Sequence, residues 1–216
     1  MPIARETVEL LVQAAKACCF DDDRRGLRDL EWTALRFLSR ANRFSRTPSA
    51  LASFIGATRA TASQIVKALE ERSYLVRKQS QTDKRSVTLD VTSAGEKLLA
   101  QHDPINSLVS AVASLSPDDG IKLKVTLHEI AARVEKPNDQ PATGHCRDCI
   151  FLVRGEAGGC ATKARTKSEL SCRLHRAPIA PQEVNLLCTS FERGHDQKNA
   201  RRTRSAGPYP RSADLL

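Results

Sequence analysis

The sequence predicts a mainly helical α+β fold with one small β-hairpin and an appended cysteine module. Three observations lead to this prediction. Apolar residues recur at helical spacing through most of the first 134 residues, as in helices with one buried face. Two strand-like runs flank a polar tip within residues 74–91, which is typical of a β-hairpin. Five of the seven cysteines lie between Cys146 and Cys188.

Local signals place the individual elements along the chain. Thr47-Pro48 combines a hydroxyl cap with a proline at the first helical position, and Gly56 marks the end of that short helix. Glu96 stands three residues after Ser93, which is the spacing of a capping box. We expect helices over 6–19, 30–38, 48–55, 59–72, from 93 onward, 105–115 and 116–134, and strands over 74–79 and 87–91.

The charge balance indicates which class of partner the protein binds. The chain carries 34 Lys and Arg against 25 Asp and Glu, which gives a net charge of +9 and a pI near 9.4. This excess favours polyanions such as nucleic acid or an anionic membrane surface. No apolar run approaches the roughly 18 residues of a membrane span, and the N-terminus lacks the pattern of a secretory signal. We therefore expect a cytoplasmic protein, and no membrane partner.

The order helix, short helix, helix, hairpin between Leu30 and Val91 is that of a helix-turn-helix followed by a wing. Residues 40–97 hold 11 basic and 5 acidic residues, so positive charge is concentrated in this region. Hydrogen-bonding and basic side chains at the start of the helix 59–72 are suited to base edges and phosphates. The expected DNA-binding residues are Thr58, Arg59, Thr61, Ser63, Gln64, Lys67, Arg77, Lys84 and Arg85.

Several short segments of this region share a recognisable sequence: Leu30–Leu38, Leu51–Ile55, Thr61–Glu70, Tyr74–Val76, Asp83-Lys-Arg-Ser86 and Leu89-Asp-Val-Thr-Ser-Ala-Gly95. Through them, residues 5–135 resemble the MarR family of winged-helix transcription regulators. The resemblance implies a homodimer, held by its N- and C-terminal helices, that binds double-stranded DNA at a pseudo-palindromic operator. It also implies that Arg85 enters the minor groove while Asp83 orients it. A glycine-rich phosphate loop, a nucleophile elbow and paired catalytic carboxylates are all missing from the sequence, so we expect no enzyme.

The cysteine-rich segment begins with the C-x2-C pair Cys146-Arg-Asp-Cys149 and continues with Cys160, Cys172 and Cys188. The segment has few bulky residues to form a core, and bound metal can supply the missing folding energy. We favour a [4Fe–4S] cluster held by Cys146, Cys149, Cys172 and Cys188, with Cys160 as the alternative ligand.

Other interpretations of the cysteines stay open. Zinc is the main alternative, because Cys172-Arg-Leu-His175 forms a C-x2-H pair that could complete a tetrahedral site with the C-x2-C pair. A thiol–disulfide switch without metal, or simple packing of small side chains, would also use these residues. For Cys18 and Cys19, which lie in the first helix, we expect core packing.

The predicted organisation is a DNA-binding and dimerisation domain over 1–136, a linker over 137–144, a cysteine module over 145–193 and a basic, disordered tail over 194–216. The leading hypothesis is a sequence-specific DNA-binding transcription regulator whose cluster senses redox state, oxygen or iron. The alternative is such a regulator with a structural zinc module that serves stability or recruits a protein partner. A third hypothesis is an electron-transfer protein with an incidental winged helix.

Overall fold

The computed structural model describes residues 2–19, 26–79, 87–134, 142–155 and 170–193. The chain divides into two compact units, residues 1–141 and residues 142–216. In the part of the chain that the model describes, no helix has both the length and the apolar character needed to cross a bilayer.

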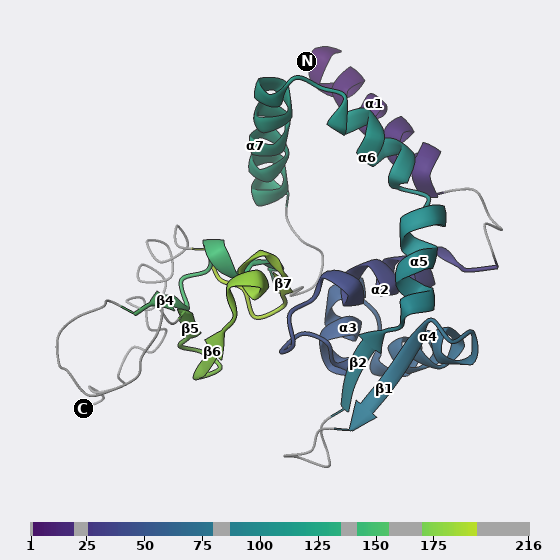
Figure 1. The fold of residues 1–216 in the computed structure, drawn as a ribbon. Coiled ribbons are helices and arrows are strands. Elements are labelled where there is room, and N and C mark those ends of the chain that lie inside the picture. The colour runs from purple at the N-terminus through teal and green to yellow at the C-terminus, as the bar shows by residue number, and fades with distance from the viewer. Residues whose placement is uncertain (1, 20–25, 80–86, 135–141, 156–169, 194–216) are drawn as a thin grey trace, which may run out of the picture. The chain divides into compact units, whose positions relative to one another are not determined.

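The first unit is mainly helical and contains one antiparallel hairpin (Figure 1). The predicted order of helices and strands is confirmed, and most boundaries agree within a few residues. The first helix begins four residues earlier than expected, at Pro2 instead of Glu6. The elements are α1 (Pro2–Cys19), α2 (Asp29–Arg40), α3 (Pro48–Ile55), α4 (Arg59–Glu71), β1 (Leu75–Gln79), β2 (Val87–Val91), α5 (Ser93–His102), α6 (Asn106–Ala113) and α7 (Pro117–Arg133).

Local hydrogen bonds define the helix-turn-helix. The Thr47 hydroxyl accepts a hydrogen bond from the backbone N–H of Ala50 at 3.2 Å and so caps α3. Gly56 ends α3 in the left-handed conformation, with φ of 66°, which glycine adopts without a steric penalty. Thr58 then caps α4 by accepting from the backbone N–H of Thr61 at 3.1 Å. The turn between α3 and α4 is therefore fixed at both ends.

An aliphatic core joins α2, α3, α4 and the hairpin. The rings of Phe37 and Phe54 stack between α2 and α3, with centroids 4.1 Å apart. One face of α4 is buried in this core through Ala62, Ile65, Val66 and Leu69. The main core residues are Trp32, Leu35, Phe37, Leu38, Leu51, Ala62, Ile65, Val66, Leu69, Leu75 and Leu89.

The hairpin is anchored at its base to the start of α5. The strands pair antiparallel, from Leu75 opposite Val91 to Gln79 opposite Val87. A Cβ atom on Gly95 would lie 2.5 Å from the carbonyl oxygen of Tyr74, closer than real Cβ atoms come. Only glycine therefore lets α5 pack this tightly against the chain that enters the wing.

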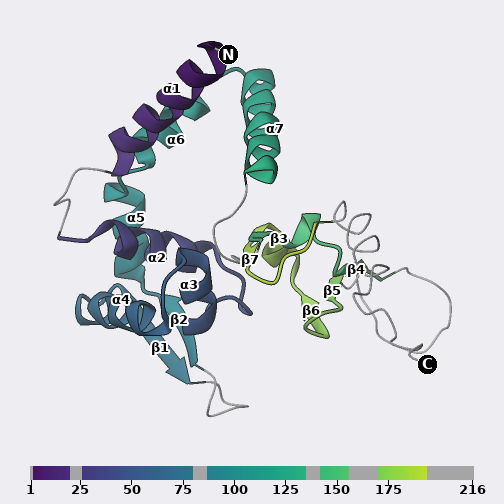
Figure 2. The same ribbon diagram turned by 180° about the vertical axis from the view of Figure 1, so that it is seen from behind.

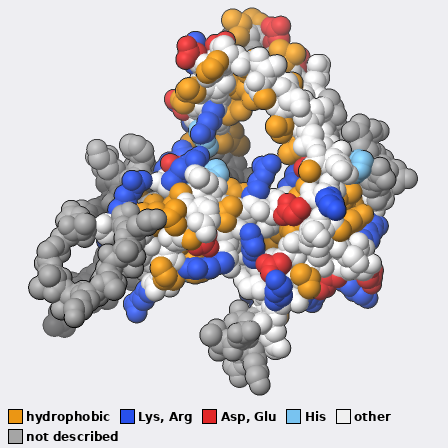
Figure 3. All heavy atoms as spheres, viewed as in Figure 1, with side chains coloured by type: hydrophobic (Ala, Val, Ile, Leu, Met, Phe, Trp, Pro, Cys, Tyr) orange, Lys and Arg blue, Asp and Glu red, His pale blue; other side chains and the backbone are white. Residues whose placement is uncertain are grey.

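The helices α1, α6 and α7 carry apolar side chains that the first unit leaves exposed. α1 packs against α6, and the two run side by side in Figures 1 and 2. Hydrophobic side chains are visible on the surface of this helical part in Figure 3. The large exposed ones are Ile3, Val8, Leu10, Leu11, Val12, Val109, Val112, Leu115, Ile121, Val125, Leu127, Ile130 and Val134.

The second unit is built from very short strands, none of which the sequence analysis predicted. β3 pairs antiparallel with β7, and β4, β5 and β6 form a separate antiparallel sheet in that order. The elements are β3 (Gly144–His145), a 3-10 helix η1 (Cys146–Asp148), β4 (Leu152–Arg154), β5 (Leu170–Cys172), β6 (Ala177–Ile179), a 3-10 helix η2 (Pro181–Asn185) and β7 (Leu187–Cys188).

Candidate nucleic-acid interface and cysteine cluster

The outer face of α4 presents polar side chains to solvent. Most of the predicted DNA-binding residues of this helix are exposed, whereas Thr61 is half-buried. The opposite face is buried in the core, so the direction in which the outer face points is fixed. The exposed members of the predicted set on or next to α4 are Thr58, Arg59, Ser63, Gln64 and Lys67.

Three of the predicted residues also make local contacts within the helix. The hydroxyls of Thr58 and Thr61 lie 3.0 Å apart, and Thr58 also caps the helix. Lys67 stays largely exposed, with its ammonium 3.7 Å from the Glu71 carboxylate one turn further along. An exposed pair of this kind is weak, so the Lys67 ammonium can still reach a phosphate.

Arg77, another predicted DNA-binding residue, pairs with α4, and its contact with DNA stays a prediction. Its guanidinium Nε lies 2.8 Å from Glu70 on α4, and its backbone N–H donates to the same carboxylate at 3.2 Å. Arg77 therefore ties the first strand of the wing to α4. The tip residues Asp83, Lys84 and Arg85 lie outside the described residues, and their roles stay predictions.

A second ion pair crosses the hairpin. The Lys78 ammonium lies 2.8 Å from the Asp90 carboxylate, and Arg46 approaches the same carboxylate at 3.5 Å. The hydrogen bond from Lys78 lowers the pKa of Asp90, and the charges of Lys78 and Arg46 add to this effect, while partial burial opposes it. Asp90 thus joins both strands of the wing to the segment before α3.

A buried carboxylate, which the sequence analysis missed, holds α4 against α2. Glu31 is 2% exposed and accepts hydrogen bonds from the backbone N–H and the guanidinium of Arg28, at 2.9 and 3.0 Å. The Arg72 guanidinium also lies 3.5 Å from the Glu31 carboxylate, and Arg72 is the C-cap residue of α4. The usual capping-box signal begins with Ser or Thr, and Arg28 stands at that position instead.

Basic residues before α3 were also missed as candidate phosphate contacts. Arg40, the last residue of α2, and Arg43, in the connection between α2 and α3, are exposed. The Arg43 guanidinium lies 4.8 Å from the centre of the Phe44 ring. Figure 3 shows Lys and Arg side chains spread over the surface of the winged-helix part. This adds positive charge beside the helix-turn-helix, where the backbone of a duplex would pass.

Strand pairing in the second unit brings three of the predicted ligands together. Cys146 and Cys188 are buried in one cluster with Phe191, and the half-buried Cys149 packs against it. The Cys149 backbone N–H donates to the Cys146 carbonyl at 3.1 Å, which closes the C-x2-C turn. A Cβ atom on Gly144, opposite Cys188 in the β3–β7 pair, would lie 2.7 Å from the Phe191 ring.

The other predicted ligands are not part of this buried cluster. Cys172 is half-buried at the end of β5, opposite Leu152 of β4. Across the described ranges, no group of three or more His, Cys, Asp or Glu side chains is arranged to hold a metal ion. The donors present are thiols, the ligand type of iron–sulfur and structural zinc sites. Cys160 and the side chains of Cys18 and Cys19 fall outside the described residues.

Comparison with known proteins agrees with the winged-helix part of this picture. Residues 25–86 match the model of the MarR family. The transcriptional repressor MprA of Escherichia coli K12 is 30% identical over 98 residues, which are 43% of this chain and 56% of MprA. The chain thus spans about half the length of the curated relatives it matches. The resemblance inferred from the sequence is confirmed for residues 25–86, a shorter stretch than the expected 5–135.

Among the solved structures that the chain partly matches are two described as complexes with DNA. FabT of Streptococcus pneumoniae in complex with DNA is 17% identical with a TM-score of 0.49, and the match covers 60% of this chain and 95% of FabT. The S. aureus MepR–DNA complex is 16% identical with a TM-score of 0.46, and the match covers 62% of this chain and 98% of MepR.

Proposed function

We propose that the protein is a dimeric, sequence-specific DNA-binding transcription regulator. The observation that carries this proposal is the outer face of α4. It presents hydrogen-bonding side chains at the start of the second helix of a helix-turn-helix, in a segment that matches the MarR family. A helix held in this way can place its first turns in the major groove, where Ser, Thr, Gln and Arg side chains read base edges.

The apolar helices support the homodimer. Residues on α1 and α7 are strongly exposed in the single chain, for example Ile3 at 78% and Ile121 at 62%. Soluble monomers rarely leave extended apolar surface uncovered, whereas a second copy of the same helices would bury it. Two copies of α4 related by a two-fold axis would read half-sites about one helical turn apart, ~34–36 Å. The operator is then an inverted repeat.

Two alanine substitutions on α4 separate the readout of bases from the neutralisation of phosphates. Gln64→Ala should reduce discrimination between operator and random duplex by ~1–3 kcal/mol, if the amide makes a bidentate base contact. Lys67→Ala should weaken binding to every duplex alike and lower the salt dependence of affinity, because it removes one phosphate contact. Fluorescence anisotropy on both duplexes at several salt concentrations measures both effects.

Lys122→Ala, an exposed lysine on α7 and not on the winged helix, is the matched control for Lys67→Ala and should leave affinity unchanged. Equal losses on operator and random DNA for Gln64→Ala would remove that residue from the base-reading set. A protein that is monomeric at micromolar concentration and binds an asymmetric site would contradict the proposal as a whole.

The cysteine module completes the proposed function as a sensor. In this proposal Cys146, Cys149, Cys172 and Cys188 hold a [4Fe–4S] cluster, and the state of the cluster changes operator affinity. The support is the shared cluster of Cys146, Cys188 and Cys149, with Cys172 on the next sheet as the fourth thiol. A cluster in a protein shell would supply sensitivity to oxygen, redox state or iron.

A structural zinc site is the second candidate for this module. It is favoured by one observation, the half-buried His175 in the turn that follows Cys172. In that case the module would serve stability or recruit a protein partner, and operator affinity would not respond to oxidants.

The two candidates differ in colour and in metal content. Anaerobically purified protein with a [4Fe–4S] cluster is brown, whereas zinc protein is colourless with one zinc per chain. Ser substitution of any of the four proposed ligands should abolish the cofactor, and Cys160→Ser should spare it. The sensor role is then tested by the operator affinity of holo protein, apo protein and Cys149→Ser at one salt concentration. Equal affinities for all three would leave the module a structural appendage.

A further inference from the structure

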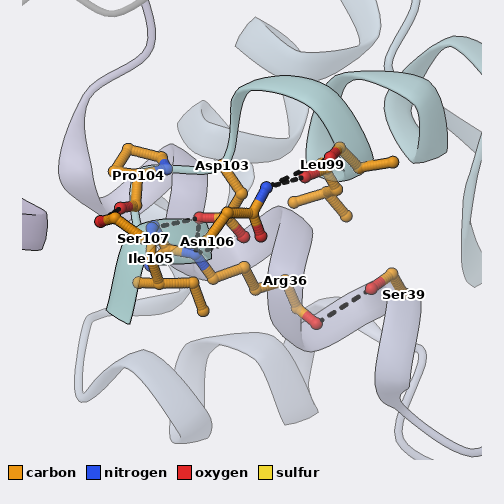
Figure 4. A network of polar contacts seen from close by, with 9 residues as sticks. Arg36, Ser39, Leu99, Asp103, Pro104, Ile105, Asn106 and Ser107 are labelled. Atoms are coloured by element: carbon orange, nitrogen blue, oxygen red, sulfur yellow. Dashed lines mark hydrogen bonds and ion pairs between the residues drawn. The ribbon is translucent and has the colours of Figure 1, made fainter. Parts of the chain in front are cut away.

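A short turn over residues 103–105 joins α5 to α6, and one carboxylate lies within it (Figure 4). Asp103 is the residue that ends α5, and its side chain is 5% exposed. Its two carboxylate oxygens accept hydrogen bonds from Nε of Arg36 on α2, at 2.8 and 3.0 Å. One of them also accepts from the backbone N–H of Ile105, at 3.1 Å, where α6 starts. A single side chain therefore contacts three helices.

The local sequence explains why the turn forms there. Pro104 disfavours a helical conformation in the residue before it, and Asp103 has extended angles, φ −60° and ψ 122°. Asn106 then closes the end of α5, because its side-chain amide donates to the carbonyls of Leu99 and Ala100 at 3.1 and 3.2 Å. The turn is thus held by Asp103 on one side and Asn106 on the other.

Arg36 connects this turn to the part of the molecule that carries the recognition helix. Its neighbours Leu35 and Phe37 are buried in the core that α2 shares with α3 and α4. The guanidinium itself is mostly buried, with 18% of its side chain exposed. Because the core fixes the position of Arg36, the ion pair transmits the orientation of the helix-turn-helix to the start of α6.

On its other side the turn leads into the helices with uncovered apolar faces. α6 follows directly, packs against α1, and has Val109 and Val112 exposed. We infer that the Asp103–Arg36 contact is the joint that sets the direction of α6 relative to the winged helix, and so the spacing of the two α4 helices in the dimer. This inference rests on the proposed function, because a spacing exists only in a dimer that binds DNA.

The chemistry of the pair favours two states of this contact, formed or broken, over intermediate ones. A buried carboxylate that loses its cationic partner is strongly destabilised, so intermediate separations are disfavoured. Rotation of α6 away from α2 would therefore require the whole contact to break and water to enter. Asp103 and Arg36 are positioning residues here, since neither lies on the outer face of α4.

Asp103→Asn is the sharpest test, because the amide oxygen can still accept from Ile105 while the charge that holds Arg36 is lost. Arg36→Gln removes the same contact from the other side, and Arg36→Lys keeps the charge but not the geometry and should give an intermediate effect. Asp119→Asn is the matched control. That carboxylate accepts a hydrogen bond from the Ser116 hydroxyl at 2.8 Å, within the first turn of α7.

Two measurements on the full-length protein are needed. Hydrogen exchange should become faster at residues 103–107 in Asp103→Asn and Arg36→Gln, while α2 and α4 stay protected as in the original protein. The affinity of the unsubstituted protein for inverted repeats should show a sharp optimum at one half-site spacing. The two variants should lose about tenfold in discrimination between optimal and altered spacing, a typical size for coupling between sites.

Each outcome decides something different. Unchanged exchange at 103–107 would overturn the joint, whatever the DNA results. Faster exchange with an unchanged spacing optimum would show that the turn is held by Asp103 but does not set the spacing, which also overturns the inference. If the original protein binds no duplex with any spacing, the proposed function fails and the inference fails with it. A loss of spacing discrimination in Asp119→Asn as well would show a general loss of helix stability instead.

Discussion

The winged helix and the cysteine module are stabilised by different kinds of core. Between α2 and the hairpin, large aliphatic and aromatic side chains such as Leu35, Phe37 and Leu69 are completely or almost completely buried. In the module, the corresponding cluster consists of two cysteines and one phenylalanine, Cys146, Cys188 and Phe191. The first core can be stable through burial of apolar area alone, whereas the described part of the module buries fewer large apolar side chains.

The lengths of the elements lead to the same conclusion. α2 and α4 contain 12 and 13 residues, while the strands of the module contain two or three. Strands this short do not hold together in water without a further link between them. The difference fits the proposed role of the cysteines in holding the module together.

If the module holds a metal as proposed, loss of that metal should have the largest effect, and only on the module. Cys146→Ser, or chelation of the proposed metal, should unfold residues 142–155 and 170–193, because structural metal sites can contribute ~10–16 kcal/mol of apparent binding free energy to folding. Limited proteolysis and hydrogen exchange would detect the loss. The melting transition of the winged helix should not change. A module that stays fully protected in Cys146→Ser would show that packing alone is sufficient.

A substitution in the winged-helix core should affect only the winged helix. Leu35→Ala removes a side chain that is 0% exposed and should lower the free energy of unfolding by ~2–5 kcal/mol, because the neighbouring side chains cannot fill the space. Denaturant unfolding followed by circular dichroism measures the change, while the metal content of the module reports whether the second unit is intact. A parallel loss of metal would contradict the independence of the two cores.

The same contrast explains how much of the fold the sequence could predict. The helices of the first unit follow an apolar period and have local caps, such as Thr47 and Thr58, so their positions were predicted within a few residues. The strands of the module have neither signal. Their pairing depends on contacts between segments as far apart as Gly144 and Cys188, which a local pattern cannot reveal.

The candidate site was predictable where it depends on one helix. The outer face of α4 follows from the period of its buried residues. The contacts that orient this helix join distant positions, such as Glu31 with Arg72 and Arg36 with Asp103, and sequence spacing gives no indication of them. Arg77 was expected on DNA because it is basic, and its pairing with Glu70 depends on how the hairpin folds back against α4.

Two glycines allow the tightness of the two regions to be compared directly. Gly95→Ala places a methyl group against the Tyr74 carbonyl oxygen, and Gly144→Ala places one against the Phe191 ring. Each should cost ~1–3 kcal/mol, as overpacking does. Gly95→Ala should lower the stability of the winged helix, and Gly144→Ala that of the module, measured by thermal melting and by metal retention. Gly120→Ala, with nothing within 4 Å of the added atom, is the control and should not destabilise α7.

The smallest expected effect concerns the ion pair across the wing, and it depends on pH. Because Lys78 and Arg46 lower the pKa of Asp90 below its ordinary value of 3.8, the folded protein binds fewer protons at this carboxyl than the unfolded chain does. The stabilisation is therefore complete above about pH 5 and is lost as the pH falls through the lowered pKa. Since Lys78 is largely exposed, the pair should contribute only ~0.2–1 kcal/mol.

Asp90→Asn should remove this contribution at neutral pH and flatten the acid side of the winged-helix stability profile. Lys78→Gln should lower neutral-pH stability by no more than Asp90→Asn does, because Arg46 remains beside the carboxylate. Denaturant melts between pH 2 and 7, at low salt and at 1 M salt, measure the difference, and high salt should reduce it because exposed charges are screened. Identical acid profiles for Asp90→Asn and the original protein would show that the pair adds nothing to the wing. The metal content of the module serves as the internal reference at neutral pH, where neither substitution should alter it.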